Sequence, residues 1–120
     1  MQHPGDCDAA CFDDTVPRAQ AYLAAGADCV YPIALRDGPM LQALVNAIDA
    51  PVNVTAGSGV PELAELARLG IARVSTATRL ATVALAAVDR AATELLSSGR
   101  FDCLASGFGY PDAQRLFDSE

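Results

Sequence analysis

The segment PVNVTAGSG at residues 51–59 is the feature that most constrains how this chain can fold. An apolar, strand-forming run ends there in a glycine-rich turn, and the periodic pattern of a helix begins directly after it, in VPELAEL. The same succession of strand, turn and helix precedes it in DCVYPIALRDGPMLQALV and follows it in ARVSTATRLATVALAAV. Three consecutive units of this kind predict an α/β fold with parallel strands.

The boundaries of the expected elements follow from these patterns. Residues 1–13 are expected to be a disordered leader, and residues 14–120 the folded part, with Asp14 or Thr15 as the first helix cap. Asp37 is predicted to cap the second helix, and Thr76 or Thr78 the longest one. That longest helix is expected to bury an apolar face running from Leu80 to Leu95. Strands are predicted at residues 28–33, 52–56 and 72–76, and helices at residues 14–25, 38–48, 61–69, 79–98 and 111–117.

Composition excludes several classes of function. The net charge is −7 and the eight basic residues are scattered, so a nucleic-acid partner is not expected. No apolar run reaches the roughly 18 residues that a membrane span needs, so no membrane association is expected either. The first residues lack the basic and apolar regions of a secretory signal, which favours the cytoplasm. Cytoplasmic cysteines are expected to be thiols.

The candidate binding residues lie where the predicted strands end, because the loops at the carboxyl ends of parallel strands form the working crevice of such folds. Gly57 and Gly59 leave backbone N–H groups open to an anion, and hydroxyl and guanidinium groups at neighbouring strand ends add donors. The alternative is that AGSG is only a tight turn and that the hydroxyls are only helix caps. The proposed substrate-binding set is Thr55, Gly57, Ser58, Gly59, Ser75 and Arg79.

No residue is assigned a catalytic or metal-binding role. Cys7 and Cys11 lie near His3, but their spacing lacks the second ligand pair that a metal site needs. His3 is the only histidine and lies in the expected leader, so no serine–histidine–aspartate set is predicted. Arg36 is a candidate partner for a carboxylate or phosphate, and Asp37 is more simply a cap than a catalytic acid.

Three quoted stretches carry a family resemblance. AQAYLAAGADCVYPIALRD, PVNVTAGSGVPELAELARLGIARVS and FDCLASGFGYPDAQRLF resemble the C-terminal half of the isocitrate lyase/phosphoenolpyruvate mutase family. They are most similar to its small bacterial members, often labelled carboxyvinyl-carboxyphosphonate phosphorylmutase or 2-methylisocitrate lyase-like. The resemblance covers about residues 13–117. It implies a partial (β/α)8 TIM barrel in which the three predicted strands are the sixth, seventh and eighth.

The resemblance also implies a chemistry. Family enzymes use Mg²⁺ and act on α-oxo acids or 2-methylisocitrate-like substrates through enolate intermediates. The acidic metal ligands, the catalytic loop and an arginine of strand five lie in the family's N-terminal half, which this sequence does not contain. We therefore expect a truncated member that is inactive alone and that meets a small carboxylate or phosphonate substrate only if the barrel is completed. The alternative is a non-catalytic half-barrel that self-associates and binds a small anion.

Two departures bear on the substrate. Strand six of the lyases ends in Phe-Pro-Glu, whereas this chain has Tyr31-Pro32-Ile33, and the lyases carry an asparagine late in strand seven, where this chain has Thr55. Family members also exchange their eighth helix between subunits. Because the predicted strands leave two unpaired edges, we expect a homo-oligomer, with exchange of the C-terminal helix as its possible form.

Overall fold

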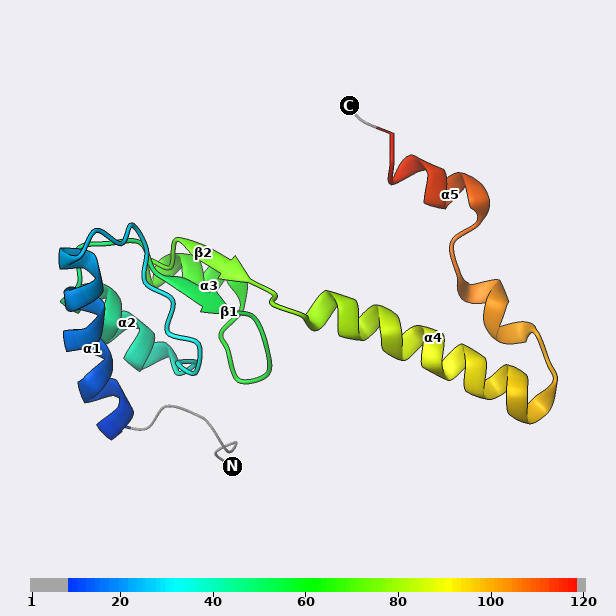
Figure 1. Cartoon of the computed structure of the whole chain (residues 1–120), viewed down its shortest axis with the longest axis horizontal. Helices are drawn as coiled ribbons and strands as arrows, with labels where there is room; N and C mark the ends of the chain where they lie inside the picture. Colours follow the sequence, from blue (N-terminus) through cyan, green and yellow to red (C-terminus); the bar gives the residue numbers. More distant parts are fainter. Residues whose placement is uncertain (1–8, 119–120) are drawn as a thin grey trace. The chain divides into compact units, whose positions relative to one another are not determined.

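A computed structural model describes residues 9–118, which divide into two units at Ala77 and Thr78 (Figure 1). The first unit is a mixed α/β structure with two parallel strands. The second is entirely helical. The elements of the first unit are α1 (Ala9–Ala24), α2 (Gly38–Ala47), β1 (Asn53–Thr55), α3 (Leu63–Arg68) and β2 (Arg73–Ser75); those of the second are α4 (Arg79–Ser98), the 3-10 helix η1 (Asp102–Ser106) and α5 (Tyr110–Arg115).

The sheet is smaller than the sequence predicts. β1 and β2 pair in parallel, with Val54 opposite Val74. The strand expected at residues 28–33 forms only a single parallel bridge between Val30 and Val52, so its predicted length is wrong. The Val30 N–H donates to the Pro51 carbonyl, and its own carbonyl accepts from the Asn53 N–H, both at 2.9 Å. Pro32 has no N–H to extend this ladder, and no further strand of the described chain lies beside it.

The core lies on one face of this sheet. Val52 and Val54 are fully buried, and they pack with apolar residues of α2 and α3, among them Leu41, Leu44 and Leu66. Because side chains alternate along a strand, Asn53 and its neighbours on the paired strands face the opposite side. The two faces of the sheet therefore differ: one is a valine surface under helices, and the other carries polar side chains.

Several predicted helix ends are confirmed. The Asp37 carboxylate accepts a hydrogen bond from the Met40 N–H at 3.0 Å and so caps α2. Gly70, with φ of 83°, ends α3, and a Cβ there would lie 3.1 Å from Val45 Cγ1. Thr78 stands at the N-cap of α4, although its side chain makes no capping hydrogen bond.

The first helix begins earlier than predicted. α1 starts at Ala9, so neither Asp14 nor Thr15 caps it, and Pro17 lies inside the helix. Alanines favour helix strongly enough to extend it toward the N-terminus. The Thr15 hydroxyl instead donates to the Cys11 carbonyl at 2.8 Å, as an interior helix residue does. The rest of the expected leader, residues 1–8, lies outside the described residues.

The cysteines depart partly from expectation. Cys11 takes part in a disulfide, so the prediction that the cysteines are thiols is wrong for this residue. Cys29 and Cys103 are half-buried thiols that form no disulfide. Cys7, which was considered with Cys11 as a weak metal pair, lies outside the described residues.

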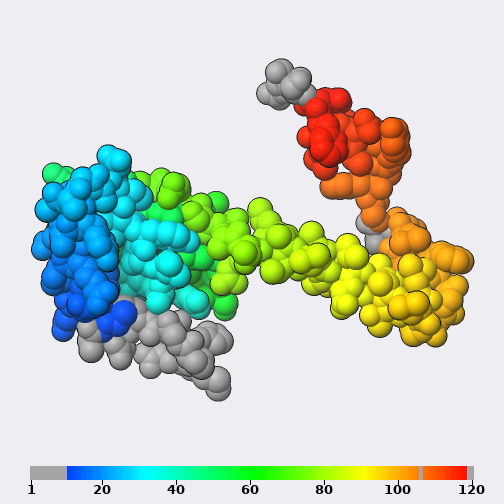
Figure 2. All heavy atoms as spheres, viewed as in Figure 1, coloured from blue at the N-terminus to red at the C-terminus, as the bar shows by residue number. Residues whose placement is uncertain are grey.

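The apolar face of α4 is not buried. None of its residues is buried, and only Ala91 and Leu95 are half-buried, so the predicted inner face is exposed within its unit. Figure 2 shows this stretch as a rod one helix wide. Leu80, Val83 and Val88 each expose about two thirds of their surface. Isolated helices are marginal in water, so α4 needs a surface to pack on. No helix of the described chain is long and apolar enough to span a membrane.

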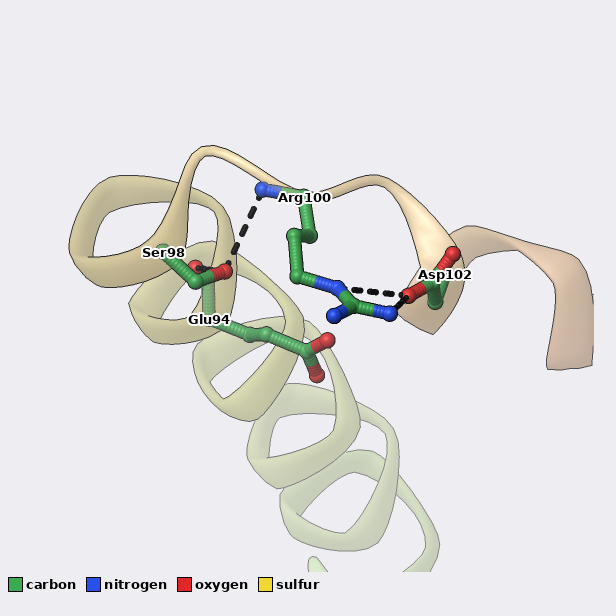
Figure 3. Close-up of polar contacts among 4 residues, drawn as sticks. All are labelled: Glu94, Ser98, Arg100 and Asp102. Atoms are coloured by element: carbon green, nitrogen blue, oxygen red, sulfur yellow. Dashed lines mark hydrogen bonds and ion pairs between the residues drawn. The ribbon is translucent and has the colours of Figure 1, made fainter.

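A set of polar contacts reverses the chain after α4 (Figure 3). Gly99 adopts φ of 67° and its N–H donates to the Leu95 carbonyl at 3.0 Å. The Ser98 hydroxyl donates to the Glu94 carbonyl at 2.7 Å and accepts from the Arg100 N–H at 3.2 Å. The Arg100 guanidinium then pairs with Asp102, which opens η1. This turn places η1 against the end of α4.

Truncating a buried leucine of the first unit should destabilise the protein much more than truncating an exposed leucine of the second unit. Leu44 is fully buried, so Leu44→Ala should lower the free energy of unfolding by about 2–5 kcal/mol. The matched control is Leu96→Ala, because Leu96 is 90% exposed and its loss should change stability by less than about 0.5 kcal/mol. Urea unfolding followed by circular dichroism measures both. Equal effects of the two substitutions would contradict this assignment of the core.

Candidate functional site

The polar face of the sheet brings together side chains from three neighbouring chain segments. Thr55 ends β1 and Ser75 ends β2, and the two residues lie directly opposite each other in the parallel register. The Tyr31 hydroxyl lies 2.7 Å from the Thr55 hydroxyl. Two of the predicted binding residues are therefore neighbours at the carboxyl ends of adjacent strands, as the pattern predicted.

Asn53 lies two residues before Thr55 in β1, so the two side chains are on the same face of the sheet. It is the buried polar residue of the described chain, with 0% of its surface exposed. Its Oδ1 accepts a hydrogen bond from the Ser75 hydroxyl at 3.0 Å. Its Nδ2 has no hydrogen-bond partner among the described residues. A buried amide donor without an acceptor costs about 1–3 kcal/mol, so this side chain calls for a partner beyond those present.

Sequence reasoning did not single out Asn53 or assign a role to Tyr31. The signal for Asn53 was its position between two valines of a strand, two residues before Thr55. Alternation places it on the polar face, and an amide there is out of place in an apolar strand. Tyr31 has no such signal, because its contact with Thr55 crosses from one strand segment to the next.

The glycine turn after β1 is closed by its own backbone. The Val60 N–H donates to the Gly57 carbonyl at 3.3 Å, and Gly59 adopts φ of 82°. The Ala56 N–H is also taken, by the Ser75 carbonyl at 2.8 Å. α3 then starts only at Leu63, with the carboxylate-bearing Glu62 as its N-cap residue. These contacts fit the tight-turn alternative, and anion binding by the turn stays a prediction.

The remaining predicted residues are more dispersed. Ser58 is exposed on the turn, and Asp37 acts as the helix cap. Arg36 is half-buried just before that cap. Arg79 is the first residue of α4 and therefore belongs to the second unit, whereas the strand ends belong to the first.

The strand ends do not fit a magnesium site. They offer hydroxyl and amide groups, whereas protein sites for Mg²⁺ are built with carboxylates. Within residues 9–118, no three of the acidic, histidine and cysteine side chains cluster in a way that holds a metal ion. What the face can supply is hydrogen-bond donors to an oxygen-rich ligand.

The unpaired amide gives a stability prediction. Asn53→Leu combined with Ser75→Ala replaces the polar pair with apolar groups of similar shape and removes the orphaned donor. We expect the double variant to be about 1 kcal/mol more stable than the wild type in urea unfolding. Ser75→Ala alone is the control and should be destabilising, because it leaves the Asn53 Oδ1 without its donor as well. A double variant less stable than this control would show that the amide already has an acceptor.

The chain matches known proteins over most of its length. Residues 7–96 match the family model described as phosphoenolpyruvate phosphomutase. A search of curated proteins gives no match. Among solved structures, a protein described as a lyase/mutase from Burkholderia cenocepacia J2315 has a TM-score of 0.82 and 41% identity over 90% of this chain. A protein described as a phosphonomutase from the same organism has a TM-score of 0.66 and 36% identity over 78% of it.

A more distant structure supports the fold alone. Oxaloacetate acetylhydrolase in complex with oxalate has a TM-score of 0.70 at 20% identity over 91% of this chain. The chain spans only 40%, 36% and 38% of the lengths of these three proteins, respectively. It corresponds to part of a barrel domain in them. On the family match and the 41% identity, this chain is a partial-domain member of the phosphoenolpyruvate mutase/isocitrate lyase family.

Proposed function

We propose that this chain supplies strands six to eight of a (β/α)8 barrel and, with them, one wall of the site of a lyase or mutase. The observation that carries the proposal is the polar face of the sheet, where Thr55 and Ser75 end adjacent parallel strands. In (β/α)8 enzymes the site lies at the carboxyl ends of the strands. The substrate class is a small carboxylate or phosphonate, because this wall presents donors.

The chain's own part in the chemistry is binding and orientation. The Thr55 hydroxyl donates to an oxygen of the substrate, the Ser75 hydroxyl orients the Asn53 amide beside it, and the glycine turn closes one side of the site. Mg²⁺, when present in such a barrel, holds the negative charge that develops on the substrate oxygens. The described residues do not fit a site for that ion. We propose that its ligands come from the rest of the barrel.

The exposed face of α4 favours a second function, self-association without catalysis. Leu80, Val83 and Val88 expose about two thirds of their surface on a helix that has no buried residue. Packing this face on another copy of the chain would remove it from water, at roughly 25 cal/mol for each Å² of apolar surface. We propose that α4 is exchanged between copies in a homo-oligomer.

Completing the barrel tests the first proposal. The chain would be co-expressed with the N-terminal part of the Burkholderia cenocepacia lyase/mutase that the match does not cover. Oxaloacetate, 2-methylisocitrate and phosphoenolpyruvate would be assayed with Mg²⁺. We expect turnover from the complex and none from this chain alone. Thr55→Val in the complex should lower kcat/KM about tenfold, since it removes a hydrogen bond to charged substrate.

Two outcomes would contradict that proposal. Mg²⁺-dependent turnover by the chain alone would show that its residues suffice for the chemistry. The second outcome is a stable complex that turns over none of the three substrates in an assay where the intact Burkholderia protein is active. It would show that this wall is not functional.

Molar mass in solution tests the second proposal. Val88→Lys places a charge on the exposed apolar face of α4, and Thr93→Lys places the same charge on another exposed residue of the helix. Light scattering after size-exclusion chromatography should show an oligomer for the wild type and the Thr93 variant. The oligomer of the Val88 variant should dissociate at protein concentrations at least about tenfold higher than those at which the wild-type oligomer dissociates. A monomeric wild type, or equal behaviour of both variants, would overturn helix exchange.

A further inference from the structure

Two pairs of side chains on the polar face of the sheet are hydrogen-bonded to each other. The Asn53 Oδ1 accepts from the Ser75 hydroxyl at 3.0 Å, and the Tyr31 and Thr55 hydroxyls share one hydrogen bond of 2.7 Å. Neither N–H of the Asn53 side-chain amide donates a hydrogen bond within the described chain. The direction of the hydrogen bond between the two hydroxyls then decides what the strand ends present to a ligand.

The chemistry of the two hydroxyls favours Tyr31 as the donor. A phenol has a reference pKa near 10 and is far more acidic than an alcohol. Its oxygen is also the weaker acceptor, because a lone pair is delocalised into the ring. With the Tyr31 proton directed at the Thr55 oxygen, the Thr55 proton points away from Tyr31. Thr55 then acts as a donor toward whatever lies beyond the strand end.

Within residues 9–118, no carboxylate hydrogen-bonds to Tyr31 or Thr55 and so reverses this polarity. Ile33 is 68% exposed and offers no hydrogen bond.

We propose that Tyr31 is a positioning residue that fixes the Thr55 hydroxyl as a donor, which makes this strand end selective for an anionic oxygen of a carboxylate or phosphonate over a hydroxyl-bearing group. The inference rests on the proposed function, since it concerns the same wall. It assigns Tyr31 an effect that acts through Thr55 and not by direct contact with the substrate.

Binding of oxalate to the full chain tests the proposal. Oxalate carries only acceptor oxygens and would be titrated into ¹⁵N-labelled protein while amide shifts of residues 53–59 are recorded. Tyr31→Phe should raise the oxalate Kd about three- to tenfold, the effect of one hydrogen bond. Thr55→Val should do the same, and the double variant should be no weaker than either single one, because both remove the same interaction. Thr55→Ser should bind as the wild type does.

The matched control is Tyr110→Phe, which removes a phenol from α5. Tyr110 is 79% exposed and belongs to the second unit. Its substitution should leave the oxalate Kd within twofold. Urea midpoints of all variants within the error of the wild type would show that the effects are not due to unfolding.

The results that overturn the proposal are distinct from those that overturn the proposed function. A Tyr31→Phe Kd within twofold of the wild type, or losses that multiply in the double variant, would show that Tyr31 does not act through Thr55. No oxalate binding by the wild type at about 100 mM would reject the donor site as it stands in this chain. Turnover in the completed barrel would in that case still support the wall itself.

Discussion

Burial of Val52 and Val54 beneath α2 and α3 is the interaction on which the rest of the first unit depends. It fixes which face of the strands meets the helices, and a slip of one residue would exchange every side chain between faces. The polar face follows from it. Asn53 and Thr55 lie on the face opposite the core because the valines beside them pack against the helices.

The second unit lacks any comparable interaction. α4 has good helix-forming residues and a well-made C-terminal cap, yet nothing within its unit covers its apolar face. Local propensity determines that the helix forms in the structure, whereas its stability in water requires packing. The same reasoning applies to the sheet, whose outer strands have backbone groups with no neighbour in the described chain. Both features are those of a partial domain, in agreement with the coverage of about two fifths of its relatives.

Local patterns predicted much of this structure. The Asp37 cap, the glycine after α3 and the bounds of α4 all follow from residues close together in sequence. The errors arose where the outcome depends on distant partners. The strand at residues 28–33 is reduced to the Val30 bridge because Pro32 has no N–H to continue the ladder and no further strand of the described chain pairs with it. The apolar stripe of α4 predicted a buried face, but within its own unit this face is exposed.

The candidate site shows the same division. Thr55 and Ser75 were predicted as neighbours because the ends of parallel strands meet at one edge, and the register bears this out. The contact of Tyr31 with Thr55 depends on how far the tyrosine side chain reaches across the sheet, which no short pattern encodes. The unpaired state of the Asn53 amide is likewise a property of packing and becomes visible only in three dimensions.

The turn after α4 has a consequence for assembly. Gly99, Ser98 and the Arg100–Asp102 pair bind the helix end to η1, so the two elements form one continuous block (Figure 3). In the exchange proposed for α4, the receiving copy would also have to accommodate η1 at the C-terminal end of the helix. The surface that receives the block would then be wider at one end than a single helix requires. This asymmetry would favour one direction of packing over the reverse.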